Sequence, residues 1–234
     1  MKKLIIITAA LAASLPVFAQ TLPLYVAGDF NGWNPAGNVM TETSPGSGIW
    51  QATLTGLSAG RHEFKVTEGD WSWNYPGANS WLYPDANGNI TITYDSNTYA
   101  DGWSTTAQRI GESTDPGTWT AVGDFQALVW NNADAATAMT ALGGGIYEYT
   151  LSTVGSWNWK PCVTGTWDSI SWDNRSIGTA NWAFTINAGE AADLYVNALA
   201  GTAKVDIVTV PEPTTMALCA LSGLAMLVVA RRRS

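Results

Sequence analysis

The feature that most constrains the fold of this 234-residue chain is an internal repeat. The string Val26–Asn34, which reads VAGDFNGWN, returns in part at Ala121–Phe125 as AVGDF, with Trp130-Asn131 just beyond. Later segments are similar in the same order: Gly48–Leu54 corresponds to Gly145–Leu151, and Phe64-Lys65 corresponds to Trp159-Lys160. Self-similarity at a nearly constant offset indicates a tandem duplication. The chain is therefore predicted to hold two copies of one small module.

The two ends of the chain carry targeting features that do not belong to the fold. Residues 1–19 contain two lysines, an apolar run and a small-residue cleavage site, which together predict a secretory signal peptide. At the other end, Pro211-Glu212-Pro213 precedes an apolar stretch at 214–230, which is at the short edge of the length that crosses a bilayer. The final basic cluster, Arg231, Arg232 and Arg233, would hold that end in the cytoplasm. We expect export through the inner membrane and a separate C-terminal segment at 210–234.

Between these ends the chain is acidic and rich in tryptophan. Without the two end segments, 6 basic and 18 acidic residues remain, a net charge of −12. Such a body cannot gather phosphates by counterion release, so nucleic acid is not expected as a partner. The whole chain has 13 tryptophans and only 13% charged residues. This composition suits a secreted β protein with a neutral, polar partner, and a sugar fits that description.

Cysteine and histidine are too scarce in the body to form a disulfide or a histidine-based metal cluster. Cys162 is the one cysteine between the end segments, and its place in an apolar stretch predicts a buried strand residue. His62 is the single histidine of the chain and is expected to face solvent from a strand. No cofactor or metal is expected.

Each copy reads as short strands separated by turn residues. Residues 61–67 alternate, so that His62, Phe64 and Val66 share one face of a strand. The body has no convincing helical period, although residues 134–142 could form one helical turn or two. We therefore predict an all-β fold of two tandem immunoglobulin-like β-sandwich modules. The expected parts are a signal helix at 1–19, modules at 22–99 and 119–208, a linker at 100–117 and a C-terminal apolar helix within 210–234.

The ordered motifs of the first copy resemble those of carbohydrate-binding module family 48. Gly28–Trp33, Gly48–Trp50, Gly60–Val66 and Gly69–Trp71 follow one another as in the glycogen-binding domain of the AMP-activated kinase β subunit. Modules of pullulanases and starch-binding outer-membrane proteins are similar too. The resemblance covers about residues 22–95. The second copy keeps the Gly-Asp-Phe start but carries extra residues before its tryptophan.

This resemblance implies a sugar-binding site on the module. A sugar would stack on Trp33 and Trp71 and accept hydrogen bonds from Lys65 and from an asparagine near the last strand, either Asn87 or Asn89. An indole covers the apolar C–H face of a glucose ring, whereas the rim hydroxyls need fixed donors and acceptors. The residues in the corresponding places of the second copy are Trp130, Lys160 and Trp167.

Aromatic residues of such a module also have structural roles. Trp50 and Tyr147 lie inside alternating strands and are expected in the core. Trp33 lies in a turn, where it either stacks on a sugar or packs as a lid on the sandwich, and Lys65 could equally belong to a solvated strand face. The surplus of aromatic residues favours a binding surface; its members are Trp71, Trp73, Tyr75 and Trp81.

The C-terminal segment resembles the PEP-CTERM sorting signal, in which Pro-Glu-Pro, an apolar span and a basic cluster follow in order at the very end. The resemblance implies that an exosortase-type membrane transpeptidase reads Pro211, Glu212 and Pro213 and then severs or transfers the chain. A plain C-terminal membrane anchor is the alternative that these residues leave open.

Two classes of function fit these features. The first is an exported, non-catalytic protein of the cell surface, outer membrane or extracellular matrix that binds a polysaccharide, either an α-glucan or an exopolysaccharide. The second is a structural surface or matrix protein that keeps the β-sandwich without a working sugar site. Catalysis is not expected, because the candidate acids lie in turns where aspartate is favoured for its local hydrogen bonds; they are Asp29, Asp70, Asp124 and Asp168.

Overall fold

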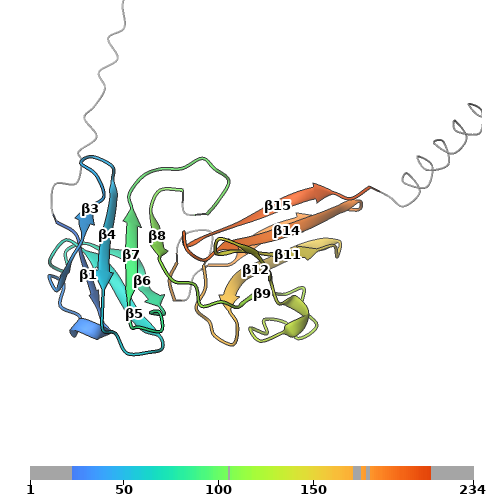
Figure 1. Cartoon of the computed structure of the whole chain (residues 1–234). Coiled ribbons are helices and arrows are strands. Elements are labelled where there is room, and N and C mark those ends of the chain that lie inside the picture. Colours follow the sequence, from blue (N-terminus) through green and yellow to red (C-terminus); the bar gives the residue numbers. More distant parts are fainter. Residues whose placement is uncertain (1–22, 105, 171–174, 178–179, 212–234) are drawn as a thin grey trace, which may run out of the picture.

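The computed structural model describes residues 23–104, 106–170, 175–177 and 180–211 (Figure 1). Within these residues the regular structure is fifteen strands and two short 3-10 turns, η1 at Asp29–Asn31 and η2 at Ala135–Thr137. All strand pairs are antiparallel and form four sheets. The prediction of an all-β fold with β-sandwich modules is confirmed. The predicted signal helix and the C-terminal apolar helix lie outside the described residues.

The first module is a sandwich of two four-stranded sheets. One has the order β2-β1-β5-β6, built from Asn38–Val39, Tyr25–Gly28, His62–Thr67 and Asn74–Leu82. The other has the order β3-β4-β7-β8, built from Thr41–Glu42, Ile49–Leu54, Ile90–Asp95 and Arg109–Glu112. Alternation along β5 turns Phe64 and Val66 inward, where they pack with Ile92 and Tyr94 of the facing sheet.

His62 faces the interior rather than solvent, which corrects the expectation for this residue. Its exposed fraction is 9%. The ring Nδ1 lies 2.8 Å from Asp29 Oδ1, and Nε2 lies 2.9 Å from the carbonyl oxygen of Ser58. Burial opposes charging of the ring, but the hydrogen bonds to Ser58 and Asp29 together outweigh it and hold the pKa of His62 above its usual value.

The second module is a sandwich of a three-stranded and a four-stranded sheet. The three-stranded sheet has the order β13-β12-β9, built from Trp182–Ile186, Gly155–Val163 and Trp119–Gly123. The other has the order β10-β11-β14-β15, built from Thr140–Gly143, Ile146–Leu151, Glu190–Asn197 and Thr202–Thr209. Cys162 on β12 is fully buried, as expected, and burial raises the pKa of its thiol to about 12.

Several local expectations change in detail. Residues 100–117, expected to form a linker, contain strand β8, which pairs with β7 and completes a sheet of the first module. Residues 134–142 form only the short turn η2 before β10 begins at Thr140. Tyr147 is buried as expected, whereas Trp50 is half-buried and packs at the edge of the first core.

The two modules meet at a buried junction around Trp81. This residue lies on β6 of the first module, but its fully buried side chain packs into the core of the second. Its ring centroid is 6.0 Å from that of Trp119, and its Nε1 donates to the carbonyl oxygen of Ser169 over 3.3 Å. The expectation that Trp81 belongs to an exposed binding surface is therefore wrong. A face that looks like surface within one module is covered by the other.

A buried ion pair also crosses the junction. Arg175 Nη2 lies 2.6 Å from Glu112 Oε2, and both side chains are fully buried. The guanidinium stacks over the ring of Trp81 at 3.8 Å and donates to the carbonyl oxygen of Ala198. Burial raises the pKa of Glu112 against the opposing charge of Arg175. Each charge depends on its partner, because an unpaired charge in this place would be costly.

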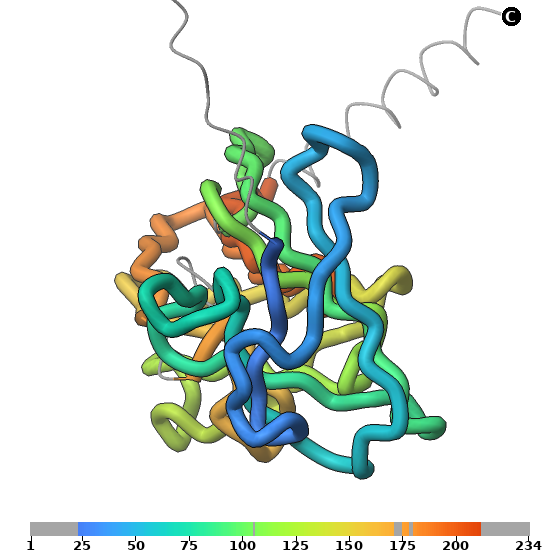
Figure 2. Tube along the Cα trace, turned by 90° about the vertical axis from the view of Figure 1, so that its left-hand side faces the viewer, coloured from blue at the N-terminus to red at the C-terminus, as the bar shows by residue number. Residues whose placement is uncertain are grey.

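Three connecting segments gather at one end of the molecule. They are the turn after β1, the loop after β9 and the loop after β12, and both views place them at the lower end (Figures 1 and 2). These segments carry Trp33, Trp130 and Trp167, respectively. Tryptophans predicted from both modules to contact sugar therefore come from the same end of the protein.

Candidate functional site

The turn after β1 holds Trp33 in an unusual backbone conformation. Trp33 has φ of 60°, in the left-handed region that a bulky residue avoids, and its backbone N–H donates to the Gly28 carbonyl oxygen over 2.8 Å. Asn31 stabilises the turn, because its Oδ1 accepts from the backbone N–H groups of Gly28 and Asn34. A left-handed non-glycine residue costs about 1–2 kcal/mol. Strain of this kind gathers at functional positions, so it marks Trp33 as a candidate.

Gly28 makes this turn possible. A Cβ atom at Gly28 would lie 2.4 Å from the ring of Phe30 and 2.5 Å from the carbonyl oxygen of Glu63. Only glycine lets β1 approach β5 so closely while Phe30 folds back over it. The glycine, the aromatic residue and the asparagine of the GDFN motif therefore serve the shape of the turn, and Trp33 is the residue that the turn presents.

Trp33 and Trp71 face each other across a shallow hollow. Their ring centroids are 6.4 Å apart at an interplanar angle of 43°. Trp71 is 44% exposed and Trp33 is half-buried, so neither ring is a core residue. The hollow has a volume of about 220 Å³, and its lining residues are Trp33, Lys65, Trp71 and Asn79. Two tilted indoles with polar groups beside them can hold the apolar face of a ring-shaped polar ligand.

Trp71 is presented by a tight loop between β5 and β6. Asp70 Oδ1 accepts from the backbone N–H of Ser72 over 2.8 Å and also from its hydroxyl. These bonds hold the pKa of Asp70 below its usual value. Gly69 supplies a positive φ of 94° against the ring of Tyr25. Local turn chemistry thus fixes the loop that carries Trp71.

Lys65 lines the hollow, but its ammonium group is already hydrogen-bonded. Nζ donates to Asn74 Oδ1 at 2.8 Å, to the carbonyl oxygen of Pro76 at 3.0 Å and to that of Gly77. An ammonium group has three donors, and these three acceptors use all of them. Burial lowers the pKa of Lys65. Lys65 therefore braces the start of β6 in this structure, and a hydroxyl of a ligand would have to replace one of the three acceptors.

The asparagine in the hollow is Asn79, which sequence reasoning missed. Its Nδ2 donates to Glu63 Oε2 over 2.7 Å, and no described residue donates to its Oδ1. This oxygen is available to accept a hydrogen bond from a ligand. Strand β6 brings Asn79 beside Lys65, because Ser80 pairs with Phe64 in the sheet. Residues 74–82 were not predicted as a strand, and the pairing of this strand with β5 is what brings Asn79 to the hollow.

Asn87 and Asn89 lie in the turn between β6 and β7 and are not among the residues that line the hollow. Asp85 Oδ1 accepts from both of their backbone N–H groups. Gly88 between them approaches the backbone of Leu57, which accounts for the burial of this one residue in an otherwise exposed turn. The two asparagines therefore build a turn, and the asparagine that lines the hollow is Asn79.

The second module repeats the turn but not the hollow. Trp130 has φ of 61°, and its backbone N–H donates to the Gly123 carbonyl oxygen over 3.1 Å. Gln126 has the same role here as Asn31 in the first module, because its Oε1 accepts from the backbone N–H of Gly123. Lys160 is half-buried on β12, and Trp167 is 52% exposed in the loop that follows. Among the described residues no ring contact joins Trp130 to Trp167.

The acidic side chains considered for catalysis all accept structural hydrogen bonds. Asp29 accepts from His62 and from the backbone N–H of Glu63, while Asp124 accepts from the backbone and side chain of Asn158. Asp70 caps its own loop, and Asp168 is bound by Arg61. In the part of the chain that the structure describes, no group of three or more histidine, cysteine or acidic residues could hold a metal ion.

The predicted C-terminal sorting signal lies outside the described residues except for its first proline. Pro211 is exposed at the end of the described residues, and Glu212, Pro213, Arg231, Arg232 and Arg233 lie beyond it. None of the described residues belongs to a helix of the length and apolarity that a membrane span requires.

Comparison with known proteins finds a similarity between the first module and one domain family. Residues 25–100 match the model of the pullulanase X25 domain. Two solved structures are similar over 80% of this chain: SusF from Bacteroides thetaiotaomicron, at 14% identity and a TM-score of 0.35, and a pullulanase from Bacillus acidopullulyticus, at 13% identity and a TM-score of 0.29. The chain spans 48% of the first and 28% of the second. No curated protein matches.

Proposed function

We propose that this protein is a non-catalytic carbohydrate-binding protein whose ligand is a neutral polysaccharide, with an α-glucan as the first candidate. The observation that carries the proposal is the pairing of Trp33 and Trp71 around the hollow, with Trp33 held against its own backbone preference. The match of residues 25–100 to the pullulanase X25 domain supports a glucan. The net charge of −12 on the body argues against an anionic ligand.

The chemistry of the hollow fits a sugar ring. The indoles supply apolar faces, and Asn79 supplies an open acceptor. Lys65 supplies a donor when a sugar hydroxyl replaces one of its three acceptors within the chain. A stacking contact contributes on the order of 1 kcal/mol per ring. A single site of this size is therefore weak, and a polymer with many sugar units is a better ligand than a monosaccharide.

The test is binding of the purified protein to insoluble starch, with cellulose and chitin as comparison polymers, together with titration of pullulan while tryptophan fluorescence is followed. A sugar that stacks on Trp33 and Trp71 should change their emission. Trp71→Ala should remove the change and the retention on starch, whereas Ile207→Ala, an exposed apolar residue on β15, should retain both. Absence of binding to every polymer, with an unchanged spectrum, would favour the structural alternative.

That alternative is a surface or matrix protein that keeps the sandwich without a working site. The observation in its favour is that all three Lys65 donors already have acceptors within the chain. The fluorescence titration separates the two functions, because a structural protein has no reason to respond to a glucan.

We further propose that the protein is exported and that an exosortase-type transpeptidase reads Pro211, Glu212 and Pro213, so that it reaches the cell surface, outer membrane or extracellular matrix. The support is the order of the three C-terminal features in the sequence. Glu212→Ala should leave export intact and retain a longer, membrane-bound form. Unchanged mature mass and location would favour a plain anchor.

A further inference from the structure

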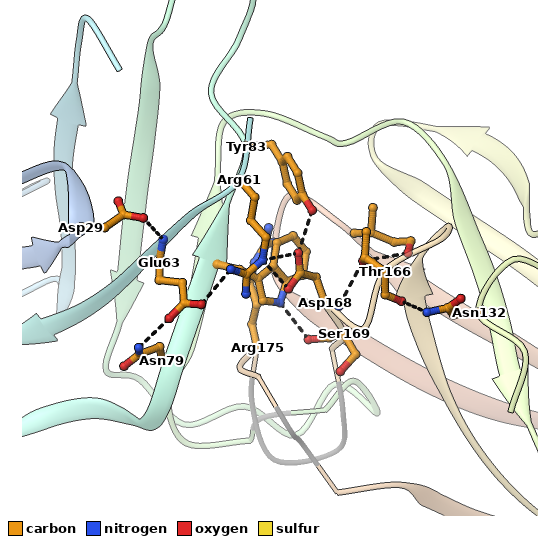
Figure 3. A network of polar contacts seen from close by, with 12 residues as sticks. Asp29, Arg61, Glu63, Asn79, Tyr83, Asn132, Thr166, Asp168, Ser169 and Arg175 are labelled. Carbon is orange, nitrogen blue, oxygen red and sulfur yellow. Dashed lines mark hydrogen bonds and ion pairs between the residues drawn. The ribbon is translucent and has the colours of Figure 1, made fainter. Parts of the chain in front are cut away.

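A continuous line of polar contacts leads from the hollow into the second module (Figure 3). Asn79, which lines the hollow, donates to Glu63 Oε2, and Glu63 Oε1 lies 2.8 Å from Arg61 Nη1. Arg61 Nε in turn donates to both carboxylate oxygens of Asp168 at 2.8 Å. The side chains of Arg61 and Glu63 are 33% and 30% exposed, so this line runs along the surface.

Trp167 stands at the far end of this line. It directly precedes Asp168 and is 52% exposed. The loop around it is held on both sides, because the Thr166 hydroxyl accepts from the backbone N–H of Asp168, and Asn132 Nδ2 donates to the Thr166 carbonyl oxygen over 2.8 Å. This loop therefore holds an exposed indole face beside the polar line, and a sugar ring can cover such a face.

The distance between the hollow and Trp167 is set by the junction. Tyr83 of the first module donates its hydroxyl to Asp168 Oδ2 over 2.7 Å, so this carboxylate receives hydrogen bonds from two first-module residues. The buried stack of Arg175 on Trp81 lies behind them. The backbone N–H of Ile177, in the second module, also donates to the carbonyl oxygen of Asn79. The second module therefore touches the hollow through the backbone and fixes Trp167 relative to it.

We propose that one glycan chain binds across the junction, from the Trp33–Trp71 hollow over Arg61 and Glu63 to Trp167. This assigns Trp167 to an extended site shared by both modules, in place of a separate site with Trp130. The guanidinium can donate to sugar hydroxyls and the carboxylate can accept from them, while the two ends supply stacking faces. The inference rests on the proposed function and narrows its ligand to a chain long enough to leave the hollow.

The test compares a short and a long linear α-1,4-glucan, maltotriose and maltodecaose, by calorimetric titration of the full protein. One additional stacking contact should make maltodecaose bind roughly five- to tenfold more tightly than maltotriose. Trp167→Ala should remove most of that gain and leave maltotriose affinity unchanged. Trp33→Ala should weaken both ligands, and Ile207→Ala should affect neither. Circular dichroism of each variant checks that the fold is intact.

The outcomes separate this inference from the proposed function. Maltotriose binding that depends on Trp33, with no gain for the longer glucan or no effect of Trp167→Ala, overturns the shared site and leaves the proposed function standing. Two maltotriose sites per protein, one of which is lost in both Trp130→Ala and Trp167→Ala, also overturns it in favour of separate sites. No binding of either glucan overturns the α-glucan proposal and this inference together.

Discussion

Trp33 and Trp130 adopt the same left-handed backbone conformation, and each donates its backbone N–H to the glycine that begins its turn. The two turns are built with different side chains, since Asn31 in one and Gln126 in the other accept from that glycine. The backbone conformation of the turn is thus the same in both modules, although a different side chain stabilises it in each. A strained conformation that recurs in this way has to be over-determined by its surroundings.

This strain gives a prediction that separates stability from binding. The free energy of unfolding of Trp33→Gly should be about 0.5–1 kcal/mol higher than that of Trp33→Ala, because glycine adopts φ of 60° without strain and alanine does not. Both variants should lose sugar binding equally. Urea titration of the pair, together with starch retention, measures the two effects. An alanine variant as stable as the glycine variant would mean that the turn relaxes when the indole is removed.

Two tryptophans on neighbouring segments should respond in opposite ways. Trp81→Ala should lower the free energy of unfolding by about 3–5 kcal/mol, because it opens a cavity at the junction. Trp71→Ala should change stability by about 0.5 kcal/mol or less, because its ring is 44% exposed, while glucan binding is lost. Thermal unfolding and a glucan titration of both variants check this contrast. Equal destabilisation would place Trp71 in the core.

The buried ion pair of the junction should depend on both partners. Glu112→Ala leaves Arg175 without its carboxylate and should cost about 3–5 kcal/mol of unfolding free energy. The double variant Glu112→Leu with Arg175→Met should be less destabilised than Glu112→Ala alone, because it leaves no unpaired charge. A double-mutant cycle by urea titration measures this coupling, and additive effects would contradict it.

The stability of the first module should fall as pH rises through the titration of His62. The pKa of this ring is raised in the folded state, so its contribution is fully present below the unfolded value of about 6.5. The contribution is lost as pH rises through the higher, folded pKa. Urea midpoints at pH 6 and pH 8 should differ more in the native protein than in His62→Gln. The same pH dependence in both would assign it to other groups.

Much of the module can be understood from neighbouring residues in the sequence. The alternation along residues 61–67 was sufficient to predict a strand with His62, Phe64 and Val66 on one face, because side chains two apart share a face. The GDFNGW string predicted a turn that presents Trp33, since its glycine and asparagine act within a few residues. Trp33, Lys65 and Trp71, which the resemblance placed together, line one hollow.

Tertiary structure alone decided what happens between the modules. Arg61 and Asp168 are 107 residues apart in the chain, and no local pattern indicates that they meet. Trp81 and Leu82 point to opposite faces of β6: Leu82 packs in the core of the first module, whereas the second module covers Trp81. His62 lies on the same inward face of β5 as Phe64 and Val66, and Asp29 and Ser58 supply the hydrogen-bond partners that its buried ring needs. The sequence by itself therefore determined the strands, the turns and the tryptophans that they present, all of which depend on short-range geometry. Docking of the modules decided that Trp81 is buried. It also decided that Asn79 and Trp167 lie at the two ends of one line of polar contacts. Both depend on contacts between residues that are distant in the chain.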